Sequence, residues 1–70
     1  KIKKNMAIGT RIKQLRLSKN LSQKQLAKIL HTTNSSICDW ECGRTLPKIT
    51  YLIAIANFFN VTADFLLGIN

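Results

Sequence analysis

Seventy residues, 46% of them hydrophobic and with only three glycines and one proline, suit one compact helical domain and exclude a disordered chain. The formal net charge is +8, and nine of the 11 lysines and arginines lie in residues 1–28. This one-sided charge attracts polyanions such as nucleic acid, although lysine-rich surfaces also serve solubility.

The first predicted helix spans residues 6–18. Ile8, Ile12 and Leu15 recur at steps of four and three residues, which is the spacing of one apolar helix face. Asn20 is suited to the left-handed conformation that often ends a helix. No apolar run in the chain reaches the roughly 18 residues of a membrane span. Because no signal-peptide core follows the basic start either, we expect a cytoplasmic protein.

The second predicted helix spans residues 23–30 and begins with a strong cap. Ser22 and Gln25 have the spacing of a capping box, in which each side chain accepts a hydrogen bond from the other residue's backbone N–H. The apolar face of this helix is expected to bury Leu26, Ala27, Ile29 and Leu30. His31 and Thr32 break the helix, and Thr33 is a suitable N-cap for the next one.

The third predicted helix, residues 34–42, ends at Gly43 and is poor core material. Its apolar stripe consists of Ile37 and Trp40, and the remaining positions are mostly polar. Such a helix is suited to presenting side chains outward. It also carries Cys38 and Cys42, and two thiols cannot complete a four-ligand zinc site. We interpret them as reduced cysteines, with a redox role for Cys38 as the alternative.

A fourth helix follows Pro47 and is expected to be mostly buried, through Ile49, Leu52, Ile53, Ala56 and Phe59. Thr62 caps a short fifth helix, residues 63–67, which Gly68 ends. The predicted fold class is therefore all-α, with five helices. The second and third helices form a helix-turn-helix over residues 22–41.

Two ordered segments carry a family resemblance: Ser22-Gln23-Lys24-Gln25-Leu26-Ala27, and the run from Ile37 to Pro47 that contains Trp40-Glu41-Cys42-Gly43. With matching positions that continue to Gly68, the chain resembles the phage-repressor and Cro-type helix-turn-helix family over about residues 7–68. Each short motif is weak alone, but the ordered set is specific. The resemblance implies a compact lambda-repressor-like domain that inserts its third helix into the DNA major groove.

The resemblance also implies roles for individual residues. Four positions match residues that face DNA bases: Thr33, Asn34, Ser35 and Asp39. Four others are assigned to backbone phosphates: Gln23, Lys24, Cys38 and Arg44. Gln23 also matches a glutamine that supports the start of the third helix, the recognition helix that enters the major groove. Arg16 and Glu41 match a partly buried ion pair that ties the first helix to the end of the third.

Three positions depart from the family pattern. His31 stands where glycine is frequent in a left-handed turn, which costs about 1 kcal/mol. Cys38 replaces a frequent serine, which weakens a hydrogen bond to DNA there. Asp39 stands where basic or amide residues are usual, and phosphates repel its carboxylate. It either accepts a hydrogen bond from cytosine N4 or pairs with a neighbouring side chain.

The predicted function is sequence-specific binding of double-stranded DNA by a transcriptional regulator, expected to be a repressor. A homodimer on a pseudo-palindromic operator is expected, with the loop around Leu46 and residues 65–70 as candidate dimer surfaces. The alternative is an antitoxin or co-activator-like module that uses the same fold to hold a protein. With one histidine and three carboxylates, the chain assembles no catalytic site, so we expect no enzyme, no metal and no cofactor.

The first five residues are assigned to a basic tail and residues 6–70 to the DNA-binding domain. Met6 is the only methionine, so either the native start is Met6 or the chain was cut from a longer protein. We expect Lys1, Lys3 and Lys4 to lie in a disordered tail, with an arm that contacts DNA as the alternative. A protein of this kind would act in the cytoplasm, associated with the nucleoid.

Overall fold

A computed structural model describes the backbone of residues 4–68 and the side chains of residues 8–68. Five helices make up the fold: α1 (Lys4–Ser18), α2 (Gln23–Leu30), α3 (Asn34–Cys42), α4 (Ile49–Phe59) and α5 (Ala63–Leu67). Residues 4–68 contain no strand, so the all-α fold class is confirmed. The first helix begins at Lys4, two residues before the start that the apolar pattern indicated. Lys1–Lys3 of the assigned tail lie outside the described residues.

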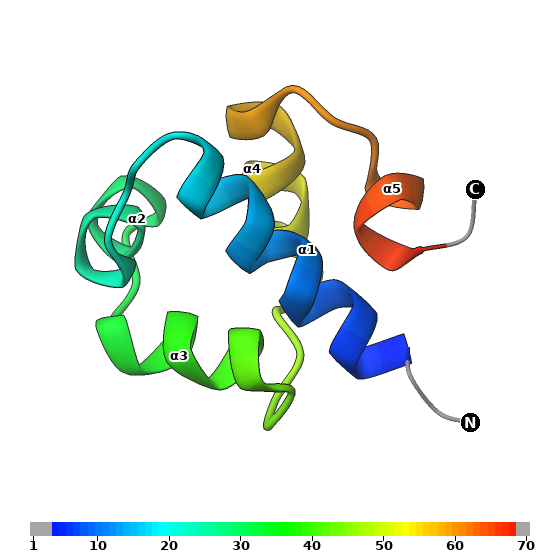
Figure 1. The fold of residues 1–70 in the computed structure, drawn as a ribbon, viewed down its shortest axis with the longest axis horizontal. Coiled ribbons are helices and arrows are strands. Elements are labelled where there is room, and N and C mark those ends of the chain that lie inside the picture. The colour runs from blue at the N-terminus through cyan, green and yellow to red at the C-terminus, as the bar shows by residue number, and fades with distance from the viewer. Residues whose placement is uncertain (1–3, 69–70) are drawn as a thin grey trace.

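The arrangement places α3 on one side of the molecule. In Figure 1, α1 crosses the centre, with α2 on the left, α3 along the bottom, α4 behind it at the top and α5 on the right. The first helix packs against both α3 and α5, and α2 packs against α3. No helix within residues 4–68 has the length and apolar character needed to cross a membrane.

Side-chain caps explain where α2 and α3 begin. The Ser22 hydroxyl accepts from the Gln25 N–H at 3.0 Å, and the Gln25 side chain accepts from the Ser22 N–H at 2.8 Å. The Thr33 hydroxyl accepts from the Ser36 N–H at 3.1 Å. These contacts satisfy backbone N–H groups that have no partner within their own helix. The predicted capping box and the predicted Thr33 cap are both confirmed.

A three-residue turn, residues 31–33, joins α2 to α3. His31 adopts a left-handed conformation with φ of 58°, as expected for the position where the family often has glycine. The Thr32 N–H donates to the Ala27 carbonyl at 2.9 Å, which closes the end of α2. This closed turn sets the angle at which α3 leaves α2.

The core takes one completely buried aliphatic side chain from each helix: Ile12, Leu26, Ile37, Ile55 and Leu66. Trp40 joins them and its ring lies 5.2 Å from that of Tyr51, measured between centroids. The thin stripe predicted for α3 is thus its anchor, because Ile37 and Trp40 are the buried residues of this helix.

Three isoleucines expected in the core are exposed instead. Ile49 keeps 65% of its surface exposed, and Ile53 and Ile29 also face outward. Nearly every residue of α4 is apolar, so its sequence does not reveal which face packs. The buried face of α4 consists of Leu52, Ile55, Ala56 and Phe59. The prediction that Ile29, Ile49 and Ile53 are buried was therefore wrong.

Candidate nucleic-acid interface

The outward face of α3 consists of short polar side chains. Asn34, Ser35 and Cys38 are exposed, and Asp39 is partly exposed. Ser35 and Asp39 are one helical turn apart, and so are Cys38 and Cys42, so each pair lies on one side of the helix. Ile37 and Trp40 hold the opposite side against the core. The helix therefore presents hydrogen-bonding groups along a face that stays exposed among the described residues.

Thr33 differs from the other predicted base-contacting residues because its hydroxyl is already engaged. Besides accepting from the Ser36 N–H, this hydroxyl donates to the Ser36 hydroxyl at 3.0 Å. Asn34 and Ser35 have no comparable hydrogen bond among those found in the described residues. In the free protein the role of Thr33 is to start α3, and the groups free for a ligand come directly after it.

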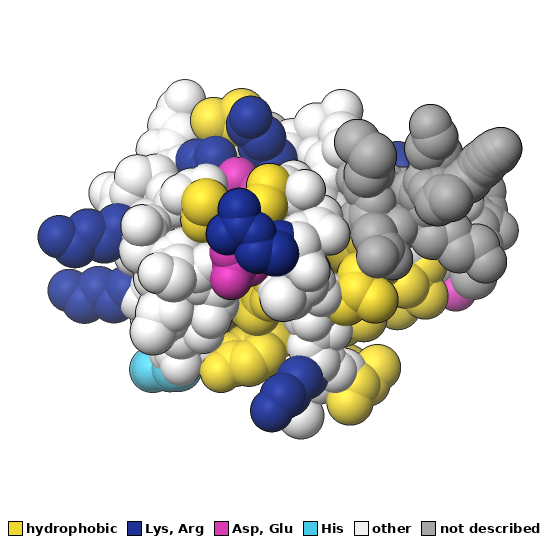
Figure 2. Space-filling model, turned by 90° about the horizontal axis from the view of Figure 1, so that it is seen from below, with side chains coloured by type: hydrophobic (Ala, Val, Ile, Leu, Met, Phe, Trp, Pro, Cys, Tyr) yellow, Lys and Arg dark blue, Asp and Glu magenta, His cyan; other side chains and the backbone are white. Residues whose placement is uncertain are grey.

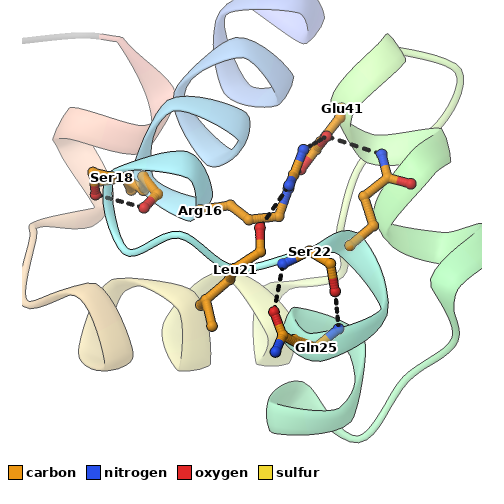
Figure 3. Close-up of polar contacts among 8 residues, drawn as sticks. Arg16, Ser18, Leu21, Ser22, Gln25 and Glu41 are labelled. Atoms are coloured by element: carbon orange, nitrogen blue, oxygen red, sulfur yellow. Dashed lines mark hydrogen bonds and ion pairs between the residues drawn. The ribbon is translucent and has the colours of Figure 1, made fainter.

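An ion pair joins α1 to the end of α3. Arg16 donates from Nε to Glu41 Oε2 at 2.6 Å and from Nη2 to Oε1 at 3.0 Å. The two side chains are only 9% and 5% exposed. The remaining nitrogen, Nη1, donates to the Leu21 carbonyl at 2.7 Å (Figure 3). The hydrogen bonds that Arg16 donates to Glu41 raise the pKa of Arg16 above its ordinary value. The pair expected from the resemblance is therefore present, and it also fixes the loop before α2.

Gln23 contacts the end of α3, whereas the resemblance implied that it supports the start of this helix. Its Nε2 donates to Glu41 Oε1 at 3.0 Å, so it supports the C-terminal end of α3 and not its start. Thr33 already caps the start of α3, whereas Glu41 Oε1 accepts from both Gln23 and Arg16. Lys24, the next residue, is exposed at the N-terminus of α2.

Asp39 forms an ion pair with Arg44, in which Arg44 Nη1 lies 3.1 Å from Asp39 Oδ1. Of the two alternatives for Asp39, the free protein shows the pairing with a neighbouring side chain. Figure 2 views the molecule from the side of α3, with a basic side chain near the centre and acidic side chains above and below it. Further basic side chains lie at the edges of this face, so its charge is mixed and not uniformly positive.

The helix-turn-helix sequence model matches residues 12–66. The chain belongs to the helix-turn-helix family. It is 42% identical over 63 residues to the HTH-type transcriptional activator BcrR of Enterococcus faecalis, covering 90% of this chain and 31% of that protein. It is 32% identical over 63 residues to the HTH-type transcriptional regulator ImmR of Bacillus subtilis (strain 168), covering 90% of this chain and 50% of that protein.

A solved helix-turn-helix structure shares the whole fold. The crystal structure of the P22 c2 repressor protein in complex with a synthetic operator superposes with a TM-score of 0.83 at 28% identity. The match covers 90% of this chain and 96% of that one. The chain thus spans nearly all of that solved chain but only about a third to a half of the length of the curated relatives above.

Gly9 is a residue of this helix-turn-helix domain whose importance the sequence analysis missed. A Cβ atom on Gly9 would lie 2.3 Å from the Trp40 carbonyl oxygen and 2.8 Å from that of Glu41. The absence of a side chain therefore lets α1 lie directly on the backbone of α3. The signal was a glycine inside a helical pattern, which often marks close packing.

A shallow groove also borders the recognition helix. It has a volume of about 370 Å³ and lies between α3 and the beginning of α4, with Trp40 and Tyr51 among its walls. Ser36, Thr45 and Lys48 contribute two hydroxyl groups and a cation to its lining. None of these three was a predicted site residue, because the family motif does not single out their positions.

Proposed function

We propose that this chain binds double-stranded DNA in a sequence-specific way, as the DNA-binding part of a transcriptional regulator. The outward face of α3 carries the proposal: Asn34 and Ser35 are exposed at the start of a helix that Thr33 caps and the core anchors. The major groove admits one helix, and side chains near its N-terminus reach the base edges. The relatives named as transcriptional regulators and the repressor–operator complex support this function.

We further propose a homodimer on a pseudo-palindromic operator, with half-sites about one helical turn of DNA apart. One short recognition helix reads few base pairs, so two copies supply the specificity. Leu46, Ile49 and Ile53 are exposed around the start of α4, which supports the surface expected near Leu46. A regulator of this kind acts in the cytoplasm on the nucleoid, and binding without catalysis is its whole activity.

Repression is the proposed direction, because the closely superposing structure is a repressor on its operator. Activation is the second candidate, because the relative at 42% identity is an activator. The direction depends on where the operator lies relative to a promoter. A reporter with the selected site placed over or upstream of the promoter tests both.

In vitro selection of duplexes from a random pool tests the proposed function. The expected result is one enriched motif, repeated with two-fold symmetry at a fixed spacing. No enrichment at low salt, together with purification only as a complex with another protein, would overturn the proposal. That outcome would favour the antitoxin or co-activator-like module.

Replacing Asn34 or Ser35 with alanine is expected to weaken binding to the selected site by about 1–3 kcal/mol each. Binding to random duplex should hardly change, because these side chains face bases and not phosphates in the proposed complex. Fluorescence anisotropy with both duplexes measures the two affinities. Equal losses on both duplexes would remove the residue from the base contacts.

Replacing Lys24 with alanine is expected to weaken binding to every duplex. A lysine at the N-terminus of α2 neutralises a phosphate, so its loss should reduce the slope of log affinity against log salt by about one unit. Lys13→Ala on α1 removes the same charge and serves as the control. An unchanged salt slope in Lys24→Ala would show that Lys24 does not contact the backbone of DNA.

A further inference from the structure

The outward face of α3 carries an ion pair between Asp39 and Arg44, and the two side chains of this pair are unequally exposed. The Arg44 side chain is 71% exposed and the Asp39 side chain 31%. Arg44 follows the end of α3 and reaches back over Asp39, five residues earlier in the chain. The group that this part of the surface offers to a ligand is therefore the guanidinium and not the carboxylate.

The backbone holds Arg44 in this position as well. Gly43 has a φ of 81°, and its left-handed conformation turns the chain back toward α3. The Arg44 N–H then donates to the Asp39 carbonyl at 2.9 Å, and the Gly43 N–H donates to the Trp40 carbonyl at 3.2 Å. This is the hydrogen-bond pattern of a Schellman motif. Asp39 thus holds Arg44 twice, through its carbonyl and through its carboxylate.

The guanidinium retains donors for a ligand while it stays paired with Asp39. Arginine carries five N–H groups in a fixed plane, and the contact to Asp39 Oδ1 engages Nη1 alone among its nitrogens. An unpaired carboxylate that faced the major groove of DNA would be repelled by the phosphates. The paired arginine can still donate directional hydrogen bonds. Because the Asp39 carboxylate offsets its charge, however, its net attraction for the phosphates of DNA is reduced, whatever the base sequence.

We infer that Asp39 is a positioning residue that holds Arg44 over the face of α3, and that Arg44, not Asp39, contacts acceptor atoms of DNA. This inference rests on the proposed function and deepens it. The acceptors are phosphate oxygens or the O6 and N7 atoms of guanine, which offer the same chemistry to a guanidinium. Asp39 favours specific binding by restricting Arg44 to one orientation and by lowering the attraction for random DNA.

A double-mutant cycle with Asp39→Asn, Arg44→Ala and the double variant tests this inference. The probes are the duplex enriched by in vitro selection and a random duplex of the same length. Asp39→Asn is expected to raise affinity for random duplex and to lower the ratio of selected to random affinity about tenfold. In the Arg44→Ala background the same change is expected to leave that ratio unchanged.

Two further arms separate the remaining explanations. Asp64→Asn on α5 removes the same charge and is expected to leave the ratio unchanged, which excludes a general effect of net charge. Selection repeated with Arg44→Ala identifies the acceptor: the same motif at lower affinity indicates phosphate, and lost preference at one base pair indicates guanine. Both results support the role of Arg44.

The opposing results are equally distinct. If Asp39→Asn changes the preferred base in the Arg44→Ala background too, Asp39 reads that base itself and the inference is wrong. The inference is also wrong if Asp39→Asn leaves the ratio of selected to random affinity unchanged in the chain that keeps Arg44. A wild-type chain that enriches no duplex would overturn the proposed function together with this inference, whereas the first two results leave DNA binding intact.

Discussion

Replacing Glu41 with alanine is expected to lower the free energy of unfolding by about 3–5 kcal/mol. Arg16 is always charged and almost fully buried, and Glu41 accepts two of its three hydrogen bonds. Removal of the carboxylate leaves a buried cation with the Leu21 carbonyl alone, and Gln23 also loses its partner. A domain of this size has a total stability of about 3–10 kcal/mol, so much of the variant would unfold. Urea denaturation followed by circular dichroism measures the change.

A double replacement separates the lost pair from the stranded charge. Arg16→Met combined with Glu41→Leu should recover most of the stability, because apolar side chains of similar volume often replace a buried ion pair without loss. The raised pKa of Arg16 means that its stabilising contribution is complete below the ordinary arginine value and is lost only as pH rises above it. The arginine therefore adds no pH dependence near neutrality. If Glu41→Ala costs less than about 1 kcal/mol, the pair behaves like an exposed one.

Helix boundaries were predictable because short-range chemistry sets them. The Ser22–Gln25 capping box and the Thr33 cap join residues three apart, so the printed sequence contains all of their partners. The left-handed residues that end helices, such as His31 and Gly43, follow the same local logic. Such signals placed α2, α3 and α5 at their observed bounds, whereas the predicted start of α1 lay two residues too late.

The face of a helix that packs was less predictable where apolar residues surround it. In α4 both the buried side with Ile55 and the exposed side with Ile49 are aliphatic. The choice between them depends on where α2 and α5 lie, which is tertiary information. The amphipathic pattern of α2 identified Leu26, Ala27 and Leu30 as buried, but it also assigned Ile29 to the buried face, and Ile29 is exposed.

The candidate site shows the same division between local and long-range information. Family motifs identified α3 as the recognition helix and paired Arg16 with Glu41, although these two are 25 residues apart. They did not show that Gln23 joins that pair, or that Arg44 covers Asp39. Both contacts depend on how the ends of α2 and α3 meet neighbouring segments, and no spacing rule describes that.

Replacing Gly9 with alanine is expected to destabilise the domain by about 1–3 kcal/mol, as overpacking of a close contact does. Helix propensity alone predicts the opposite sign, because alanine within a helix is favoured over glycine by about 1 kcal/mol. The packing effect is expected to dominate because the atoms that Cβ would meet are the backbone oxygens of Trp40 and Glu41, which no side-chain rotation can move away. To relieve the contact, α1 and α3 have to separate along their length.

That separation would reach the function as well as the fold, since α1 braces the helix proposed to read DNA. Affinity for the selected duplex should therefore fall for Gly9→Ala even at a temperature where circular dichroism shows the domain folded. Thr10→Ala, an exposed position in the same turn of α1, changes helix propensity without any such contact and should stabilise the domain slightly. If both variants raise the melting temperature alike, propensity governs both positions and the close approach of α1 to α3 carries no energetic weight.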